Sequence, residues 1–360
     1  MKTAVLRVLA INPGSTSTKL ALYENETCIF TEIIRHRTEE IVRYATINDQ
    51  FDYRLNMITQ ILVKHNVSLG SLHAVVGRGG LLQPLTSGTY IVDNCLLDGL
   101  RAGFQREHAS NLGGQLAYGL ATMAKIPAFI VDPVCVDEFE PLARFTGLPE
   151  IKRRSFFHAL NLKAVARRAA DDMKCDHNEL NFVMVHLGGG ISVGAQKKGK
   201  MIDVADPNVC GPFSPERVGS LPTDALMRMC YSGEYTLEQI KKKLNGQGGF
   251  IAHLGTNDGR EVEIRIDNGD EHAAIVFEAM AYGVAKEIGA MSTVLSGKVD
   301  AIVLTGGMAY SKRLVELLIS RVEFIAPVKV YPGEDEMQAL AEGALRVLRS
   351  EEAAKFYLAK

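Results

Sequence analysis

Short apolar runs that end at polar or glycine-rich turns recur along the whole chain, and longer stretches with helical spacing lie between them. The short runs are typical of buried strands, and the longer stretches of amphipathic helices. This pattern predicts strands over 5–12, 19–23, 72–76, 128–131, 182–187, 191–195 and 299–305. It predicts helices over 54–65, 111–123, 158–173, 271–296 and 336–349, and a capping box of Thr236 and Gln239 before another. Because strands and helices alternate to the end, the chain is expected to be α/β.

Two strand–turn–strand segments stand in matching positions, one at the head of each half. This repetition indicates a duplicated architecture of two α/β domains, over 1–150 and 151–335. The last helix, within 336–360, is expected to pack back on the first domain, where it can bury its apolar face. The helix over 271–296 is apolar over much of its circumference, so we expect it to be buried.

Composition narrows the class of protein. The 360 residues are 47% hydrophobic and 23% charged, which is typical of a globular protein and excludes a disordered chain. The net charge of −2 offers no basic excess, so nucleic acid is not expected as a partner. No apolar run suits a membrane span and the first residues do not suit a signal peptide, so we expect a cytoplasmic protein. The six scattered cysteines are expected to be reduced core thiols, not a disulfide frame or a zinc site.

The segment from Asn12 to Lys19, Asn-Pro-Gly-Ser-Thr-Ser-Thr-Lys, combines a glycine turn with hydroxyl groups and an ammonium. Ser15, Ser17 and Lys19 alternate onto one side of the predicted hairpin, where they suit phosphate oxygens. It is not a Walker A loop, because a strand follows it and the second glycine is missing. The alternative interpretation is a solvated hairpin without a ligand.

Glycines mark two further turns. Gly188, Gly189 and Gly190 precede a predicted strand, where a dinucleotide fingerprint needs a helix, so they suit a second phosphate turn or a tight turn without a ligand. Thr305, Gly306 and Gly307 follow a strand, at the edge where α/β sheets leave a ligand crevice. The polar stretch 255–258, which contains Asn257, is either a nucleotide loop or a plain turn.

Several charged residues stand beside predicted strand or helix ends. Arg78 lies between glycines after a strand and suits a carboxylate or phosphate. Asp132 suits Mg²⁺, and Glu336 either shares that role or only stabilises a helix N-terminus. His158 opens a helix and His186 ends a strand, so either can face a ligand. Six other histidines are interpreted as structural: His36, His65, His73, His177, His253 and His272.

The motifs resemble the acetokinase family over nearly the whole chain and in the same order, and within it the butyrate kinases more than the acetate kinases. They are Asn12–Lys19, Gly77-Arg78-Gly-Gly, Glu107-His108-Ala-Ser-Asn, Asp132-Pro-Val-Cys-Val-Asp-Glu, Ser155-Phe-Phe-His158, His186-Leu-Gly-Gly-Gly, Phe213-Ser-Pro-Glu-Arg217 and Leu304-Thr-Gly-Gly307. The resemblance implies the two-domain, actin-like ATPase fold of acetate and sugar kinases and Hsp70, with ATP in the cleft between an acyl-binding first domain and a nucleotide-binding second domain.

The resemblance also implies roles for individual residues. Phosphates and nucleotide are expected at Asn12, Ser15, Ser17, Lys19, His186, Gly188, Gly189, Gly190, Asn257, Thr305, Gly306 and Gly307. The acyl substrate is expected at Arg78, Gly79, Gly80, His108, Phe157 and Pro215. Catalytic groups are expected at Arg78, Asp132, His158, Arg217 and Glu336, with Mg²⁺ at Asp132 and Glu336.

Two positions depart from the acetate kinases. Gly189 stands where they carry asparagine, and Gly219-Ser220-Leu221 stands where they carry Gly-Thr-Arg. The resemblance leaves open whether nearby Arg217 takes the role of that arginine.

The implied reaction is reversible transfer of the terminal phosphoryl group of Mg-ATP to a short-chain carboxylate, giving ADP and an acyl phosphate. Acetate kinases carry Val-Val after the substrate arginine, whereas Gly79 and Gly80 stand here. We expect this loss of bulk to leave room for butyrate or isobutyrate, since each buried methylene contributes about 0.8 kcal/mol. The alternatives are an acetate or propionate kinase, a sugar or polyol kinase, and a non-catalytic ATP-binding switch. We expect a homo-oligomer.

Overall fold

The computed structural model describes residues 5–104 and 108–359, so Glu107 of the quoted motif lies outside the described residues. The chain divides into unit 1, Met1–Asp137 with Asp335–Lys360, and unit 2, Glu138–Glu334. Residues 138–150, assigned above to the first domain, therefore belong to unit 2. The Glu138 carboxylate accepts hydrogen bonds from Lys163 Nζ and from Met201 N, at 2.5 and 2.9 Å, which ties this segment to unit 2.

Unit 1 is built on one mixed sheet with the strand order β3-β2-β1-β4-β6-β5. Its strands are β1 (Arg7–Pro13), β2 (Ser17–Glu24), β3 (Thr27–Arg35), β4 (Ala74–Arg78), β5 (Thr89–Ile91) and β6 (Ala128–Val131). Strand β1 pairs antiparallel with β2 and parallel with β4. The apolar residues Val8 to Ile11 of β1 are fully buried. This burial explains the continuous apolar run from which the strand was predicted.

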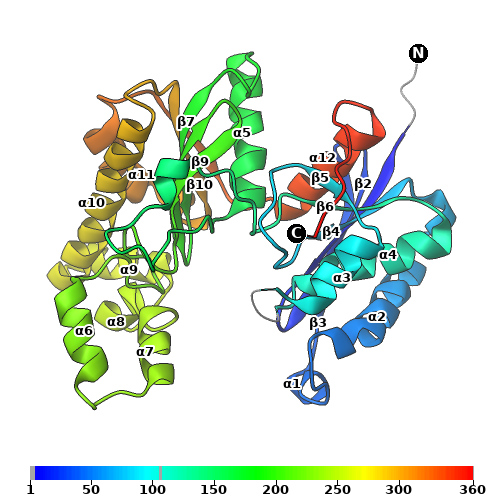
Figure 1. The fold of residues 1–360 in the computed structure, drawn as a ribbon, viewed down its shortest axis with the longest axis horizontal. Helices are drawn as coiled ribbons and strands as arrows, with labels where there is room; N and C mark the ends of the chain where they lie inside the picture. The colour runs from blue at the N-terminus through cyan, green and yellow to red at the C-terminus, as the bar shows by residue number, and fades with distance from the viewer. Residues whose placement is uncertain (1–4, 105–107, 360) are drawn as a thin grey trace. The chain divides into compact units, whose positions relative to one another are not determined.

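Helices pack on this sheet in Figure 1. The helices of unit 1 are α1 (Thr38–Ile41), α2 (Phe51–Lys64), α3 (Asn94–Ala102), α4 (Asn111–Ala124) and α12 (Glu336–Leu348), with short 3₁₀ turns η1 (Asn48–Gln50) and η2 (Leu69–Ser71). Helix α12 packs against β1, β4 and β6 and buries Leu340 and Ala344 there. A Cβ at Gly343 would lie 2.5 Å from Val131, so glycine permits this close packing.

Unit 2 repeats the same strand pairing. Its sheet has the order β11-β10-β7-β8-β9. Its strands are β7 (Asn181–Leu187), β8 (Ile191–Lys197), β9 (Lys200–Ala205), β10 (Ala301–Gly306) and β11 (Val328–Pro332). Strand β7 pairs antiparallel with β8 and parallel with β10, as β1 does with β2 and β4. The α/β class and the duplicated topology are thus confirmed.

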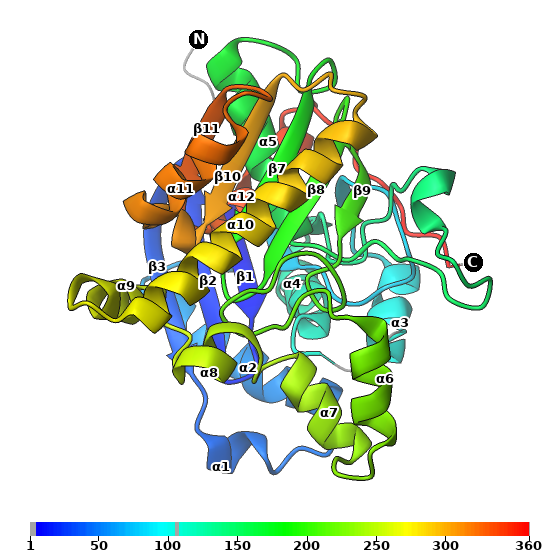
Figure 2. The ribbon, with the colours of Figure 1, turned by 90° about the vertical axis from the view of Figure 1, so that its left-hand side faces the viewer.

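Helices cover both faces of the unit 2 sheet, α10 one face and α5 the other (Figure 2). They are α5 (Ala159–Met173), α6 (Thr223–Tyr231), α7 (Leu237–Leu244), α8 (Gly249–Leu254), α9 (Gly259–Asp267), α10 (Glu271–Val294) and α11 (Lys312–Val322), with 3₁₀ turns η3 (Pro141–Arg144) and η4 (Gly307–Tyr310). The capping box of Thr236 and Gln239 is present at the start of α7.

Two expectations about burial were wrong. Helix α10 buries only one face, and Ile275 and Tyr282 on it are 67% and 52% exposed. Alanine occurs on its exposed face as well as its buried face, so the helix is apolar over much of its circumference in the sequence although only one face is buried. The six cysteines are free, but they are not all core thiols: Cys135 is buried and Cys210 is half-buried, whereas Cys28, Cys95, Cys175 and Cys230 are exposed. No helix in the described ranges is long and apolar enough to cross a membrane.

Candidate functional site

Arg78, Glu336 and Asn12 meet at one end of the unit 1 sheet. Arg78 is the last residue of β4, Asn12 lies near the end of the adjacent parallel strand β1, and Glu336 is the first residue of α12. Arg78 Nη1 and Asn12 Nδ2 both donate to Glu336 Oε2, at 2.9 and 2.6 Å. The Arg78 side chain is 29% exposed, so the guanidinium is held at one nitrogen while it still reaches solvent.

The phosphate-type hairpin is formed by β1 and β2, with Asn12 opposite Lys19. Gly14 N donates to Ser17 O at 2.7 Å and closes the turn. Ser15 is exposed, and Ser17 and Lys19 are half-buried. Across the described residues, no hydrogen bond joins the Lys19 ammonium to another side chain, so this cation is available to an anion beside the turn.

Asp132 follows β6 with a φ of 38° and is 1% exposed. Its Oδ1 accepts hydrogen bonds from Ser87 Oγ at 2.6 Å and from Gly88 N at 2.7 Å. Asp132 therefore holds the loop before β5, a structural role that the sequence did not reveal.

The acidic residues suit Mg²⁺ only when a phosphate completes the ligand set. No group of three His, Cys, Asp or Glu side chains gathers as a metal site in the part of the chain that the structure describes. Mg²⁺ commonly binds through one or two carboxylates together with substrate phosphates and water. Asp132 and Glu336 both carry oxygen donors of this kind; the side chain of Glu336 is 20% exposed, whereas Asp132 is almost completely buried.

Two stacked histidines mark the matching edge of unit 2. The rings of His158 and His186 lie 3.7 Å apart, centroid to centroid, at 11°. His158 precedes α5, and its Nδ1 lies 2.9 Å from Ser192 Oγ. His186 lies near the end of β7 and is 1% exposed, and its Nδ1 lies 2.9 Å from Asn161 Oδ1. The two histidines chosen from the sequence are therefore brought together.

Glu334 completes this cluster and was not among the site residues predicted from the sequence. Its Oε1 lies 3.1 Å from His186 Nε2. Glu334 follows β11, whose carboxyl end lies at the same sheet edge as that of β10. The rule that singled out Thr305 at the end of β10 could have found Glu334, had the strand 328–332 been predicted.

The Phe213–Arg217 segment folds onto the Gly188–Gly190 turn. Gly189 O accepts hydrogen bonds from Ser214 Oγ at 2.6 Å and from Glu216 N at 3.3 Å. A Cβ at Gly190 would lie 2.2 Å from Arg217 Nη1, so the guanidinium packs directly on this glycine.

Asn257 is linked to the same turn through Glu216, because its Nδ2 donates to Glu216 Oε1 at 2.8 Å. The structure thus brings Arg217 and Asn257 to the glycine turn. Glu216 was quoted only as part of a motif, and its role as this link was missed.

Thr305, Gly306 and Gly307 end β10 and open η4. Gly306 has a φ of 96°, and a Cβ there would lie 2.3 Å from Leu187 O, so only glycine fits. Thr305 is fully buried, and its Oγ1 donates to Gly333 O at 3.2 Å. Gly307 is exposed, with no atom within 4 Å of the position of a Cβ.

Gly79 and Gly80 do not leave space for a longer acyl chain, contrary to the prediction from the sequence. A Cβ at Gly79 would lie 2.5 Å from Pro133 Cβ, and one at Gly80 would lie 2.3 Å from Asn111 Oδ1. Pro133 and Asn111 already fill the volume that side chains would take. These glycines allow close packing behind Arg78 and open no pocket by themselves.

The other residues expected at the acyl substrate are placed as follows. Phe157 is 1% exposed and Pro215 is also buried. His108 is exposed, and its Nδ1 lies 2.8 Å from Ser110 Oγ. Phe157 and Pro215 lie in unit 2, whereas His108 lies in unit 1. The structure therefore does not bring all three together within one unit.

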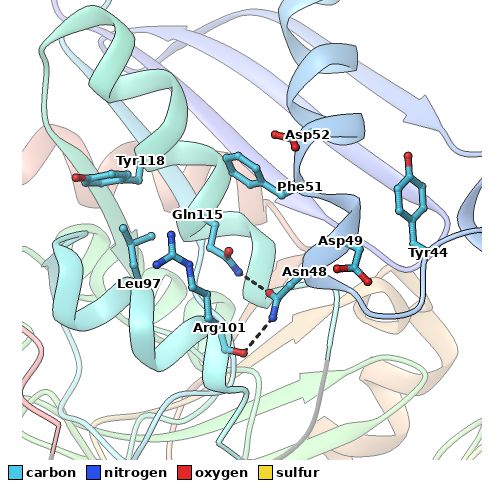
Figure 3. Close-up of a pocket in the computed structure, with 9 residues that line it drawn as sticks. All are labelled: Tyr44, Asn48, Asp49, Phe51, Asp52, Leu97, Arg101, Gln115 and Tyr118. Carbon is cyan, nitrogen blue, oxygen red and sulfur yellow. Dashed lines mark hydrogen bonds between the residues drawn. The ribbon is translucent and has the colours of Figure 1, made fainter.

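A pocket of about 660 Å³ lies elsewhere in unit 1, among α2, α3 and α4 (Figure 3). Asn48 bridges its walls: it donates to Arg101 O and accepts from Gln115 Nε2, at 3.0 and 2.9 Å. It is lined by Tyr44, Asn48, Asp49, Phe51, Asp52, Leu97, Arg101, Gln115 and Tyr118. None of the site residues selected from the sequence is among these.

Comparisons with known proteins match this chain to one protein family and to solved kinase structures. The Acetokinase family model matches residues 149–356, more than half of the chain. The Porphyromonas gingivalis acetate kinase structure superposes with a TM-score of 0.81 at 20% identity, over 95% of this chain and 100% of that one.

A propionate kinase from Francisella tularensis subsp. tularensis SCHU S4 gives a TM-score of 0.73 at 20% identity, over 94% and 98% of the two chains. A putative N-acetylmannosamine kinase from Listeria monocytogenes gives 0.53 at 13% identity, over 96% and 100%. At these identities the likeness shows the fold, which is the actin-like fold of acetate and sugar kinases.

Proposed function

The chain belongs to the acetokinase family of carboxylate kinases, and from that premise we propose that its substrate is butyrate or a similar short-chain fatty acid. In this proposal Mg-ATP and the carboxylate give ADP and an acyl phosphate, reversibly. Residues of unit 1 bind the carboxylate and the transferred phosphoryl group, and residues of unit 2 bind the rest of the nucleotide. The observation that carries the proposal is the partly exposed Arg78 at the end of β4, held by Glu336 through one nitrogen only.

Arg78 is suited to orient the carboxylate. Glu336 and Asn12 contact only its Nη1, so Nε and Nη2 form the edge of the guanidinium that can bind both oxygens of a carboxylate. A carboxylate is ionised at neutral pH and needs no general base to attack phosphorus. Catalysis then depends on positioning and on neutralising charge, as is usual for phosphoryl transfer.

His158 is the group proposed to stabilise the phosphoryl group during transfer. The Ser192 hydroxyl and the stacked His186 ring fix its orientation, and rigid orientation of a donor is what transition-state stabilisation requires. Arg217 on the Gly190 turn is proposed as a second group that neutralises the phosphates. Asp132 and Glu336 would hold Mg²⁺, which when bound neutralises phosphate charge.

The acyl-chain preference rests on the sequence resemblance to butyrate kinases and not on free space at Gly79 and Gly80. A preference by one or two methylene groups gives selectivity of only about 10- to 200-fold, so acetate and propionate are expected as weaker substrates. An acetate or propionate kinase is the alternative, favoured by the fold matches above.

The deciding experiment traps the acyl phosphate as its hydroxamate, with Mg-ATP and linear or branched acids of two to six carbons. We expect the highest kcat/KM with butyrate or isobutyrate. Arg78→Ala and His158→Ala should each lower kcat/KM about a hundredfold or more, since one lost transition-state contact costs roughly 3 kcal/mol. Arg101→Ala, which alters an exposed arginine of unit 1, serves as the control.

The outcomes separate the candidate functions. Acetate preferred over butyrate would assign an acetate kinase and refute the chain-length proposal. Phosphorylation of glycerol or sugars without hydroxamate would assign a polyol or sugar kinase. ATP binding without any product would assign a switch.

A further inference from the structure

A fully buried arginine behind the first hairpin has no part in the mechanism above. Arg54 lies in the first turn of α2, and none of its surface is exposed. Within the described residues, no carboxylate forms an ion pair with it. Burying a charge is costly unless hydrogen bonds compensate. The position of this guanidinium therefore requires an explanation.

The Arg54 guanidinium is bound mainly by the first hairpin, which accepts four of its six hydrogen bonds. Nη1 donates to Gly14 O at 2.9 Å, to Ser17 O at 3.2 Å and to Thr18 Oγ1 at 3.0 Å. Nη2 donates to Ser15 O at 3.3 Å. The remaining acceptor is Gln50 Oε1, one helical turn earlier. One side chain thus fixes every residue of the turn except Thr16.

This arrangement turns amide groups toward the open side of the hairpin. A trans peptide holds its C=O and N–H in opposite directions. Because the carbonyls of Gly14 and Ser15 face Arg54, the amides of Ser15 and Thr16 face away from it. Both residues are exposed, and among the described residues neither amide has an acceptor. Consecutive outward N–H groups of this kind form a concavity that binds anions.

A chain of hydrogen bonds runs from Arg54 through Thr18 to His36. Within this chain, Arg54 is the positively charged group. Thr18 Oγ1 lies 2.8 Å from His36 Nε2, and His36 Nδ1 lies 3.3 Å from Tyr53 Oη, which donates to Glu40 at 2.9 Å. Burial and the charge of Arg54 lower the pKa of His36 to about 4, so His36 is neutral at pH 7. Burial lowers the pKa of Arg54 only to about 10, so Arg54 stays charged.

Resting on the proposed function, we propose that Arg54 is a positioning residue for the transferred phosphoryl group. It holds the Gly14–Ser17 turn with two amides outward and places a positive charge behind them. The ligand at the turn is a phosphoryl group, from ATP in one direction and from the acyl phosphate in the other. A merely structural arginine would support the fold without changing the affinity for one substrate more than for the other.

The test compares Arg54→Gln and Arg54→Lys with Arg7→Gln, which removes a guanidinium at the opposite end of β1. We expect Arg54→Gln to raise the KM for Mg-ATP and for butyryl phosphate at least about tenfold, and the KM for butyrate less than about twofold. Arg54→Lys keeps the charge and should rescue most of this loss. Arg7→Gln should change neither constant.

Folded Arg54→Gln with unchanged phosphoryl-substrate KM values, or with all KM values raised equally, would overturn the proposal. If that variant does not fold, Thr18→Val decides: an unaltered ratio of the KM for Mg-ATP to the KM for butyrate also overturns the proposal. If the wild type makes no acyl phosphate, the proposed function fails by itself. The thermal stabilisation by Mg-ATP of wild type and of Arg54→Gln, or of Thr18→Val if Arg54→Gln does not fold, then decides, and equal thermal shifts would refute the role of Arg54.

Discussion

At the scale of single residues, buried polar side chains such as His36 are expected to determine how the stability of unit 1 depends on pH. His36 is 5% exposed and lies between Thr18 and Tyr53, with the charges of Arg54 and Glu40 close to it. From the sequence it was interpreted as one of several structural histidines. Its neighbours are hairpin and helix residues far apart along the chain, and sequence spacing cannot reveal such a contact.

His36 should make folding stability depend on pH. Its pKa is about 4 in the folded protein and 6.5 in the unfolded chain, so the unfolded state takes up a proton first as the pH falls. This contribution is fully present above pH 6.5 and is lost progressively toward pH 4, by at most about 3 kcal/mol. Urea unfolding between pH 7.5 and 4.5 measures it. His36→Gln should flatten the decline, whereas exposed His73→Gln should not, and an equal decline in all three would contradict this account.

At the scale of elements, the sequence predicted many elements with a strong apolar pattern but missed others, such as β9, in which five of six residues are buried. Strand β6 and helix α4 match within a residue: Pro127 precedes β6, Asp132 and Pro133 follow it, and Lys125 in the left-handed conformation follows α4. Strands β3 and β11 were missed, since neither has a continuous buried run: β3 is mostly exposed and β11 half-buried. The missed strand β11 is also why Glu334 beside His186 was not selected.

The glycines that end β10 give a prediction at this scale. Alanine at Gly306 would need a positive φ and would clash with Leu187 O, so Gly306→Ala should destabilise unit 2 by several kcal/mol. Gly307→Ala meets no atom within 4 Å and should leave the melting temperature unchanged. If Gly307 contacts the nucleotide, its variant should instead raise the KM for ATP. Equal melting temperatures for the two variants would refute the packing argument.

At the scale of the whole molecule, the two units differ in whether they need the C-terminal segment in order to fold. Unit 2 is continuous, Glu138–Glu334, and has its own apolar core between its sheet and α8–α11. Unit 1 needs Asp335–Lys360 as well, because α12 covers β1, β4 and β6. Without α12, the buried side chains of these strands would face water.

Residues 138–334 expressed alone should therefore fold and unfold in one cooperative transition, and should stay soluble. Residues 1–137 alone should be poorly folded, with helical and tertiary signals that rise when a 335–360 peptide is added. Circular dichroism and urea unfolding measure both effects. Neither fragment should form acyl phosphate, because Arg78 and His158 belong to different units. A stable, cooperative 1–137 fragment would show that α12 contributes little to the unit 1 core, because its apolar face would then be dispensable for burying β1, β4 and β6.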